Sequence, residues 1–150
     1  MLGEWSGESS LARSERDASC LHELFERQAR STPNRVAVVH ADGELTYAEL
    51  DARANAVARG LREAGVGTEE PVGLHVERGI DLVTAILGTL KAGAAYVPLD
   101  PAYPAERIAF MMRESGAPVI LTQRSVLEAA RADGDADGEP EHATRRICLE

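Results

Sequence analysis

Few residues in this chain combine a reactive side chain with a spacing that would permit chemistry. The histidines are dispersed, and none has a second histidine, a cysteine or a carboxylate at metal-ligand spacing. They are His22, His40, His75 and His142. No Ser/His/Asp or Cys/His arrangement can be built from spacing alone. His75 falls within an expected strand, where we interpret it as a core or near-core histidine rather than a general base.

Three carboxylates and one lysine are further candidates for acid–base work. Asp81, Asp100 and Glu106 could carry protons, but Asp100 precedes a proline in a turn and Glu106 lies in an expected first helical turn. Turn and helix-dipole chemistry therefore explains both residues without a reaction. Lys91 is the only lysine, and we expect it at a helix C-terminus, where a positive charge complements the dipole.

The glycines and cysteines also favour structure over chemistry. Gly65-Val66-Gly67 is the only close glycine pair, and it follows an expected helix instead of joining a strand to a helix. We interpret it as a connector and not as a phosphate loop. Cys20 and Cys148 are far apart and form no CxxC pair, which predicts a reducing, cytoplasmic setting. Each is expected to be a small buried hydrophobe or an exposed free thiol.

Composition narrows the class of protein. The 150 residues are 44% hydrophobic and 27% charged, as in a soluble globular domain or part of one. A net charge of −9 argues against nucleic acid and against an anionic membrane surface as partners. No apolar run is long enough to span a bilayer, and the first residues do not form a signal peptide.

The elements that must position these residues begin after a polar tail. Residues 1–18 lack periodicity and are predicted to be a linker. Ser19 is the expected N-cap of a helix that ends before Pro33, with one apolar stripe formed by Leu21, Leu24 and Phe25. A strand over residues 36–40 and an Asp-Gly turn follow.

The next helix has the clearest signals in the chain. Thr46 and Glu49 form a Thr-x-x-Glu capping box, and Gly65 is a natural residue to follow the last turn. Between them an apolar face recurs at helical spacing. Its members are Leu50, Ala54, Val57 and Leu61.

The remainder of the chain alternates between strands and helices. We expect strands at 71–77, 94–99, 118–122 and 145–150, and helices at 80–91, 104–115 and 125–131. The 94–99 run is predicted to be a buried strand in which Pro98 marks an end, an edge or a bulge. Gly93 is expected to close one helix, and Pro104 to occupy position N1 of the next. Ile108, Met111, Met112 and Ser115 would form that helix's inner stripe, and residues 133–144 a solvated acidic loop.

This alternation predicts an α/β layered fold with a mainly parallel sheet and flanking helices. The crossover connections place successive helices against the sheet. No composition break divides the region after Ser19 into two domains.

Two segments match motifs of a known family. Residues 45–50 (LTYAEL) resemble the first core motif of adenylation domains, and residues 90–108 (LKAGAAYVPLDPAYPAERI) resemble the second without interruption. The phrase CLHELF at 20–25, followed by Thr32-Pro33, is typical of the start of these domains. Residues 2–5 (LGEW) resemble the linker that leaves an upstream condensation domain. The chain thus resembles the N-terminal portion of an amino-acid adenylation domain of a nonribosomal peptide synthetase, in the adenylate-forming, AMP-binding superfamily.

The resemblance carries several expectations. Residues 1–18 would be a condensation-to-adenylation linker, and residues 19–150 a truncated N-terminal subdomain of the adenylate-forming fold. The parent would use ATP and Mg²⁺ to form an aminoacyl adenylate and pass the acyl group to phosphopantetheine on a carrier domain. Expected partners are the remainder of the adenylation domain and the neighbouring condensation and carrier domains, in the cytoplasm.

The resemblance places no catalytic, cofactor-binding or metal-binding residue in this chain. The family's phosphate loop, adenine-binding and metal-binding motifs, specificity pocket and catalytic lysine all lie downstream of Glu150. Thr46, Glu49, Gly93 and the 98–104 corner would be scaffold. We therefore expect this chain to be inactive and poorly stable alone. Two alternatives stay open, namely a non-catalytic interaction module and the start of an acyl-CoA ligase.

Overall fold

The computed structural model describes residues 19–41, 43–132 and 144–149 of the chain. Five helices and six strands alternate through these ranges. In chain order they are α2 (Leu21–Ser31), β1 (Val36–His40), β2 (Gly43–Thr46), α3 (Tyr47–Glu63), β3 (Pro71–His75), α4 (Ile80–Lys91), β4 (Ala95–Pro98), α5 (Ala105–Ser115), β5 (Val119–Gln123), α6 (Arg124–Ala132) and β6 (Arg145–Leu149). The predicted α/β class is confirmed.

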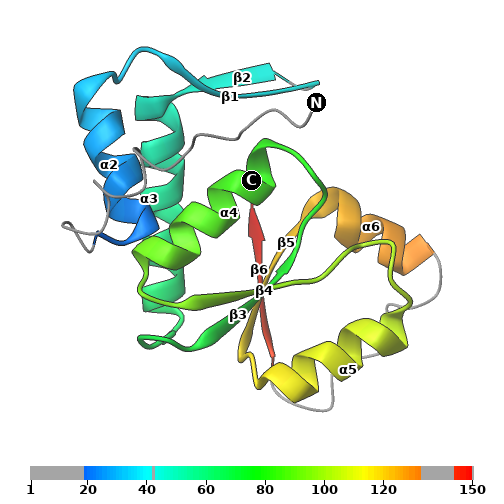
Figure 1. The fold of residues 1–150 in the computed structure, drawn as a ribbon. Helices are drawn as coiled ribbons and strands as arrows, with labels where there is room; N and C mark the ends of the chain where they lie inside the picture. The colour runs from blue at the N-terminus through cyan, green and yellow to red at the C-terminus, as the bar shows by residue number, and fades with distance from the viewer. Residues whose placement is uncertain (1–18, 42, 133–143, 150) are drawn as a thin grey trace, which may run out of the picture.

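A parallel sheet forms the centre of the molecule (Figure 1). Its strand order is β4-β3-β5-β6, and all three neighbouring pairs are parallel. β1 and β2 form a separate antiparallel hairpin. Because parallel neighbours need crossover connections, the helices between the strands are placed against the two faces of the sheet.

One face of the sheet carries α3 and α4 and a continuous apolar core. Leu61 of α3 and Ala85 of α4 pack on Val72, Leu74 and Leu121 of the sheet. All five side chains are almost completely buried. On the far side of these two helices, the β1–β2 hairpin and α2 build a second cluster around Leu45, Leu50, Ala54 and Leu87.

The opposite face carries α5 and a smaller core. Leu99, Met112, Ala117 and Ile120 are its buried members, and Val97, Ile108 and Met111 are half-buried against them. Gly73 lies at the centre of this contact, because a Cβ there would approach the Met112 Sδ to 2.7 Å. Of the predicted inner stripe of α5, only Met112 is buried.

The ends of α3 and α4 have the residues that the sequence predicts for them. The Thr46 hydroxyl accepts a hydrogen bond from the Glu49 N–H at 3.3 Å, and the Glu49 carboxylate accepts one from the Thr46 N–H at 2.8 Å. The predicted capping box is thus confirmed. Gly65 and Gly93 follow their helices at φ +87° and +83°, in the region that favours glycine.

Four predictions about helix starts and burial are wrong. Cys20, not Ser19, is the N-cap of α2, and Pro104 is the N-cap of α5 instead of its first helical residue. The apolar stripe of α2 is largely exposed, with Leu21 at 62% and Leu24 at 49%. β4 is an edge strand with mostly exposed residues and not a buried strand, although its proline does mark the edge.

Candidate functional site

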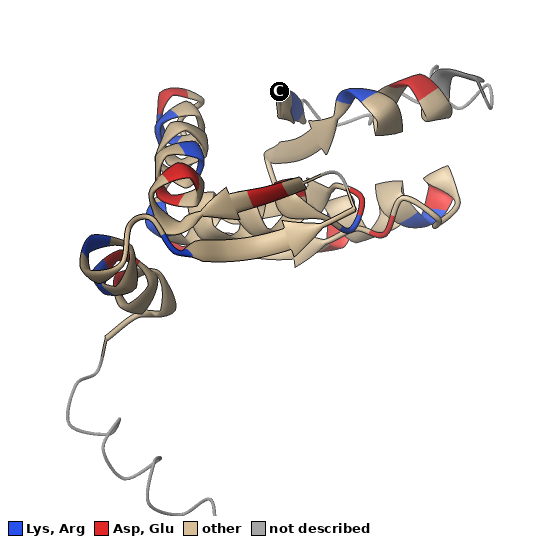
Figure 2. Ribbon diagram, turned by 90° about the horizontal axis from the view of Figure 1, so that it is seen from above, with Lys and Arg blue, Asp and Glu red and all other residues tan. Residues whose placement is uncertain are grey.

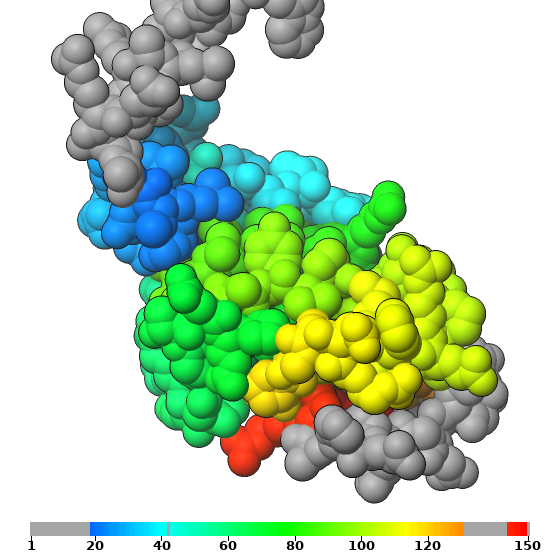
Figure 3. All heavy atoms as spheres, turned by 60° about the horizontal axis from the view of Figure 1, so that its bottom comes forward, coloured from blue at the N-terminus to red at the C-terminus, as the bar shows by residue number. Residues whose placement is uncertain are grey.

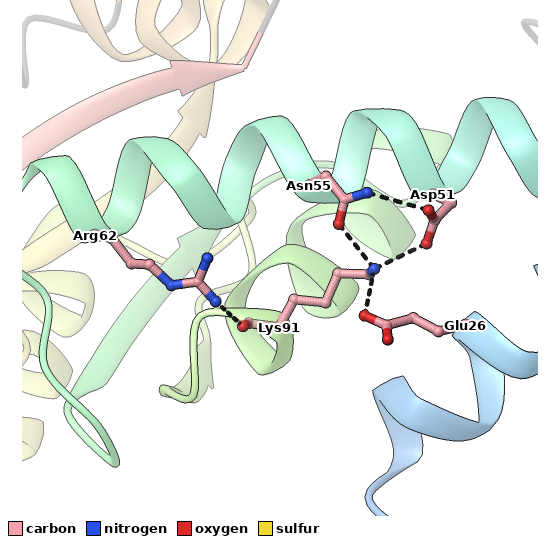
Figure 4. A network of polar contacts seen from close by, with 5 residues as sticks. All are labelled: Glu26, Asp51, Asn55, Arg62 and Lys91. Carbon is pink, nitrogen blue, oxygen red and sulfur yellow. Dashed lines mark hydrogen bonds and ion pairs between the residues drawn. The ribbon is translucent and has the colours of Figure 1, made fainter.

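Lys91 is the centre of the most connected polar group in the described structure. Its Nζ donates to Glu26 Oε1 at 2.7 Å, to Asp51 Oδ1 at 2.8 Å and to Asn55 Oδ1 at 2.9 Å. Figure 4 shows that these partners come from α2 and α3 and converge on the end of α4. We call these four residues the Lys91 hub.

The hub is internally satisfied. An ammonium group has three N–H bonds, and each of the three has an acceptor here. Asn55 also donates to Asp51 Oδ2 at 3.1 Å, and Arg62 donates to the Lys91 carbonyl oxygen. The Lys91 side chain is 4% exposed, whereas those of Glu26 and Asp51 are 32% and 28% exposed. No N–H of the ammonium remains for a substrate, and the hub joins three helices to one another.

The sequence-based interpretation of Lys91 was incomplete. Lys91 does end α4, as a dipole-complementing residue would, but its ammonium is buried in ion pairs. Its partners lie 36 to 65 positions earlier in the chain, so no local pattern could identify them. The only signal was the choice of a single lysine in an otherwise arginine-rich chain.

A second polar group lies at the carboxyl ends of the strands. His75, Thr122 and Cys148 are in register on β3, β5 and β6, and therefore share one face of the sheet. Burial lowers the pKa of His75, nearby Arg146 lowers it further, and Asp100 acts in the opposite direction. The imidazole is thus held neutral at neutral pH, which agrees with the predicted near-core histidine.

Thr122 is the one unexplained member of this row. Its hydroxyl is buried and has no hydrogen-bond partner among the described residues. A buried group of this kind costs about 1–3 kcal/mol. Because the oxygen is fully enclosed, it is not positioned to meet a ligand.

Asp81 joins two elements instead of acting as an acid. The side chain of Gln123, at the end of β5, donates to Asp81 Oδ2 at 2.6 Å and accepts from the Glu77 N–H at 2.8 Å. Ser125 donates to Glu77 Oε2 at 3.3 Å. These bonds tie the start of α4 and the loop before it to the end of β5 and the start of α6, and they use the Asp81 carboxylate structurally.

Asp100, Glu106 and the glycine pair occupy the turn, helix-start and connector positions that the sequence predicts for them. Asp100 accepts from the Ala102 N–H at 2.9 Å, and Glu106 lies in the first turn of α5. Gly65 and Gly67 connect α3 to β3, and the Gly67 N–H donates to the Glu70 carboxylate at 2.7 Å. Because the Gly67 N–H is already bonded to a carboxylate, it is not available to bind a phosphate. Gly65 and Gly67 therefore serve as a connector, as predicted.

The remaining histidines and the cysteines do not converge on a site. His22 is half-buried, the His40 ring lies against Gly79, and His142 lies outside the described residues. Cys20 and Cys148 are exposed free thiols. Within the described ranges no group of three or more His, Cys, Asp or Glu residues could hold a metal ion. Acidic and basic residues are interspersed along the helices there (Figure 2).

Comparison with known proteins identifies the scaffold. The family model for AMP-binding enzymes matches residues 25–150, most of the chain. The chain belongs to the AMP-binding enzyme family. Within this family the similarity is to the adenylation regions of nonribosomal peptide synthetases. The chain is 51% identical over 127 residues to a component of the linear gramicidin synthase of Brevibacillus parabrevis, a match that covers 85% of this chain. It is 54% identical over 106 residues to tyrocidine synthase 2 of the same organism, covering 71%.

Solved structures agree with the sequence relatives. The nonribosomal peptide synthetase FmoA3 superposes with a TM-score of 0.78 at 34% identity, covering 89% of this chain. An anthranilate CoA ligase, AuaEII, superposes with a TM-score of 0.71 but at 23% identity, which indicates a shared fold alone. The AMP-binding fold predicted from the two motifs is therefore confirmed.

This chain spans a small part of the proteins that it matches. It covers 2% of the linear gramicidin synthase component, 3% of tyrocidine synthase 2 and 14% of the FmoA3 chain. Among the helices of the described ranges, none is long and apolar enough to cross a membrane.

Proposed function

We propose that this chain is the N-terminal scaffold of an amino-acid adenylation domain in nonribosomal peptide synthesis. The observation that carries the proposal is its 51% identity over 127 residues to the linear gramicidin synthase relative. In this proposal residues 1–18 are the linker from a condensation domain, and residues 19–150 begin the adenylation domain itself.

The reaction of the larger enzyme is the activation of an amino acid. The amino-acid carboxylate attacks the α-phosphorus of ATP, pyrophosphate leaves, and an aminoacyl adenylate forms. A phosphopantetheine thiol on a carrier domain then attacks the carbonyl carbon, and AMP leaves. A solved relative, FmoA3, was crystallised with AMPPNP and with an α-methyl-L-serine adenylate, which supports this chemistry for the larger enzyme to which we assign this chain.

The described residues take no direct part in that chemistry. In this proposal the catalytic, ATP-binding and Mg²⁺-binding residues belong to the rest of the larger enzyme, and none is assigned among the described residues. The contribution of this chain is to hold a parallel sheet and its helices in the geometry that the larger enzyme needs.

Pyrophosphate exchange tests the proposal. The 150-residue chain and a chimera are each incubated with ATP, Mg²⁺, labelled pyrophosphate and the twenty amino acids. The chimera is the adenylation region of the linear gramicidin synthase relative in which residues 25–150 replace the matching segment. We expect exchange with one or a few amino acids for the chimera and none for the 150-residue chain.

Two results would contradict the proposal. Exchange by the 150-residue chain alone would show that the chemistry resides in it. A folded chimera without exchange, beside an active unaltered relative, would show that the chain is not an equivalent scaffold. Pyrophosphate exchange with fatty or aryl acids by the full-length parent of this chain would favour the acyl-CoA ligase alternative.

A further inference from the structure

The outward face of α5 carries an exposed aromatic residue, Phe110. Its side chain is 54% exposed. Ile108, Met111 and Met112 lie on the other side of the helix and contribute to the small core beneath it. Figure 3 shows α5, in yellow-green and yellow, at the surface of the molecule. A single exposed phenylalanine is common in proteins, so an inference from it depends on what surrounds it.

Four charged residues border Phe110 in two pairs. One flank of the helix carries Glu106 and Arg113, and the other flank carries Arg107 and Glu114. The members of each pair are seven positions apart, which is about two helical turns, and Phe110 lies near the midpoint of both pairs. The acid comes first on one flank and the base comes first on the other. All five side chains are exposed.

This arrangement is complementary to itself when two α5 helices lie antiparallel. In a two-fold symmetric pair the same surface contacts itself, so a residue before the axis on one flank faces a residue after the axis on the same flank of the other copy. With the axis at Phe110, Glu106 faces the second copy's Arg113. Arg107 likewise faces the second copy's Glu114, and the two Phe110 rings meet at the centre.

A parallel pair would also bring unlike charges together, but across the two flanks instead of along each one. The helix dipoles favour the antiparallel pair, because the positive end of each helix then lies beside the negative end of the other. Individual exposed ion pairs contribute little to affinity. Their role here is to fix the direction and register of the two helices, while the aromatic contact supplies most of the affinity.

One of the four charges is already held in place. The Arg107 guanidinium lies 4.1 Å from the centre of the Tyr103 ring. Stacking of this kind restricts the side chain and leaves its N–H donors available to a carboxylate. Within the described part of the chain, Glu106, Arg113 and Glu114 form no salt bridge. All four charged groups are therefore available to a partner.

We propose that the outward face of α5 is a self-association surface on which a second copy of this chain docks its own α5 in the antiparallel direction. The occupant is a second copy because the charge pattern on the two sides of Phe110 matches itself. The net charge of −9 makes two copies repel one another in general, so association is expected only where local charges compensate. The proposal uses only residues of α5 and the preceding turn, and it does not rest on the proposed function.

The expected dimer is weak. Two single helices in contact bury less than the roughly 1,600 Å² of a standard interface, so we expect a dissociation constant of about 100 μM. Sedimentation equilibrium of the 150-residue chain between about 10 μM and about 1 mM measures it. The mean mass should rise from that of a monomer towards that of a dimer, and no further.

A substitution at the centre of the surface has a matched control on another exposed apolar residue. Phe110→Glu places two like charges at the axis and should raise the dissociation constant about tenfold or more. Phe110→Ala should act in the same direction with a smaller effect. Val39→Glu is the control, because Val39 is 69% exposed on β1, far from α5 (Figure 1). It should leave the dissociation constant within about twofold of the unaltered chain, and far-UV circular dichroism should show that each variant keeps its helices.

Two charge reversals test the direction of the helices. Glu106→Arg makes one flank wholly basic, and Arg113→Glu makes the same flank wholly acidic. Each variant alone should associate about fivefold more weakly, because like charges then face one another in the antiparallel pair. An equimolar mixture of the two should recover the affinity of the unaltered chain, since the basic flank of one faces the acidic flank of the other. In a parallel pair the altered flanks would face unaltered ones, and mixing would recover nothing.

Three results would overturn the proposal. A chain that stays monomeric up to about 1 mM would show that α5 does not bind a second copy. Equal effects of Phe110→Glu and Val39→Glu, or masses that grow beyond a dimer regardless of Phe110, would assign association to other surfaces. A mixture of the two charge variants that associates no better than either alone would exclude the antiparallel pair.

Discussion

The two faces of the parallel sheet differ in how completely they are built. Under α3 and α4, Leu61, Leu74 and Leu121 are at most 1% exposed, and the Lys91 hub fixes α2 onto the same helices. Under α5, only Met112 of the helix is buried, and Phe110 is 54% exposed. Since burial of apolar area is the main stabilising contribution, the α3/α4 face should carry most of the stability of this chain.

Truncating one side chain on each face tests this comparison most strongly. Leu61→Ala opens a cavity in a fully enclosed site and should lower the free energy of unfolding by about 3–4 kcal/mol. Ile108→Ala, at a half-buried position on α5, should lower it by about 1 kcal/mol. Urea unfolding of both variants measures the difference. Equal losses would mean that the two faces contribute alike.

Removing the hub's charge should have the next largest effect. Lys91→Met keeps the aliphatic stem but leaves the carboxylates of Glu26 and Asp51 without their shared partner. Breaking a fully buried pair costs about 3–5 kcal/mol, and because these carboxylates are 32% and 28% exposed we expect about 2–3 kcal/mol. The loss should appear in urea unfolding, and amide exchange should be fastest in α2, which the hub holds in place.

A triple variant controls for the two carboxylates. Combining Lys91→Met with Glu26→Gln and Asp51→Asn removes the unpaired charges and should restore part of the stability. No recovery would mean that Lys91 contributes through packing rather than through charge.

Gly88 and Gly60 test how closely α3 and α4 pack, because only Gly88 lies at the contact between the two helices. A Cβ at Gly88 would lie 2.5 Å from the Val57 Cβ and 3.0 Å from the Ala54 carbonyl oxygen, so α3 and α4 would have to separate. Gly88→Ala should therefore cost about 2 kcal/mol. Gly60→Ala meets no atom within 4 Å and should instead stabilise the helix by about 0.5–1 kcal/mol. Thermal melts of the two variants should shift in opposite directions.

The smallest expected effect concerns pH on the α5 face. Burial lowers the pKa of His75 in the folded state, with Arg146 adding to the effect, so the unfolded chain binds this proton more readily. The contribution of a neutral His75 is fully present above the unfolded-state pKa of about 6.5 and is lost as the pH falls through the lower folded-state pKa. His75→Gln should flatten the dependence of unfolding free energy on pH in that window, measured against the parent chain.

Local signals predicted the elements well because their causes lie within a few residues. The bounds of β1 and α4 match the predicted 36–40 and 80–91, and the Thr46 capping box and the glycines after α3 and α4 act as expected. The two misplaced N-caps, at Cys20 and Pro104, are each shifted by one residue from the predicted position. A one-residue difference at helix starts is common because helix ends fray, and their boundaries vary by one or two residues.

Burial and the polar contacts were harder to predict because they depend on distant partners. The apolar run at 94–99 gave no indication that β4 would be an edge, since strand order arises from the crossovers. The α2 stripe is apolar, but only Ala29 is buried and Phe25 is half-buried. The hub joins residues from three helices, and spacing along one helix cannot show such a contact. The absence of catalytic residues was inferred from the family motifs and stays a prediction.

The position of the single lysine has a practical consequence for protein chemistry. Because Lys91 is enclosed and triply bonded, reagents that acylate primary amines should find almost only the α-amino group of the native chain. Labelling at Lys91 would then report the opening of the helical layer.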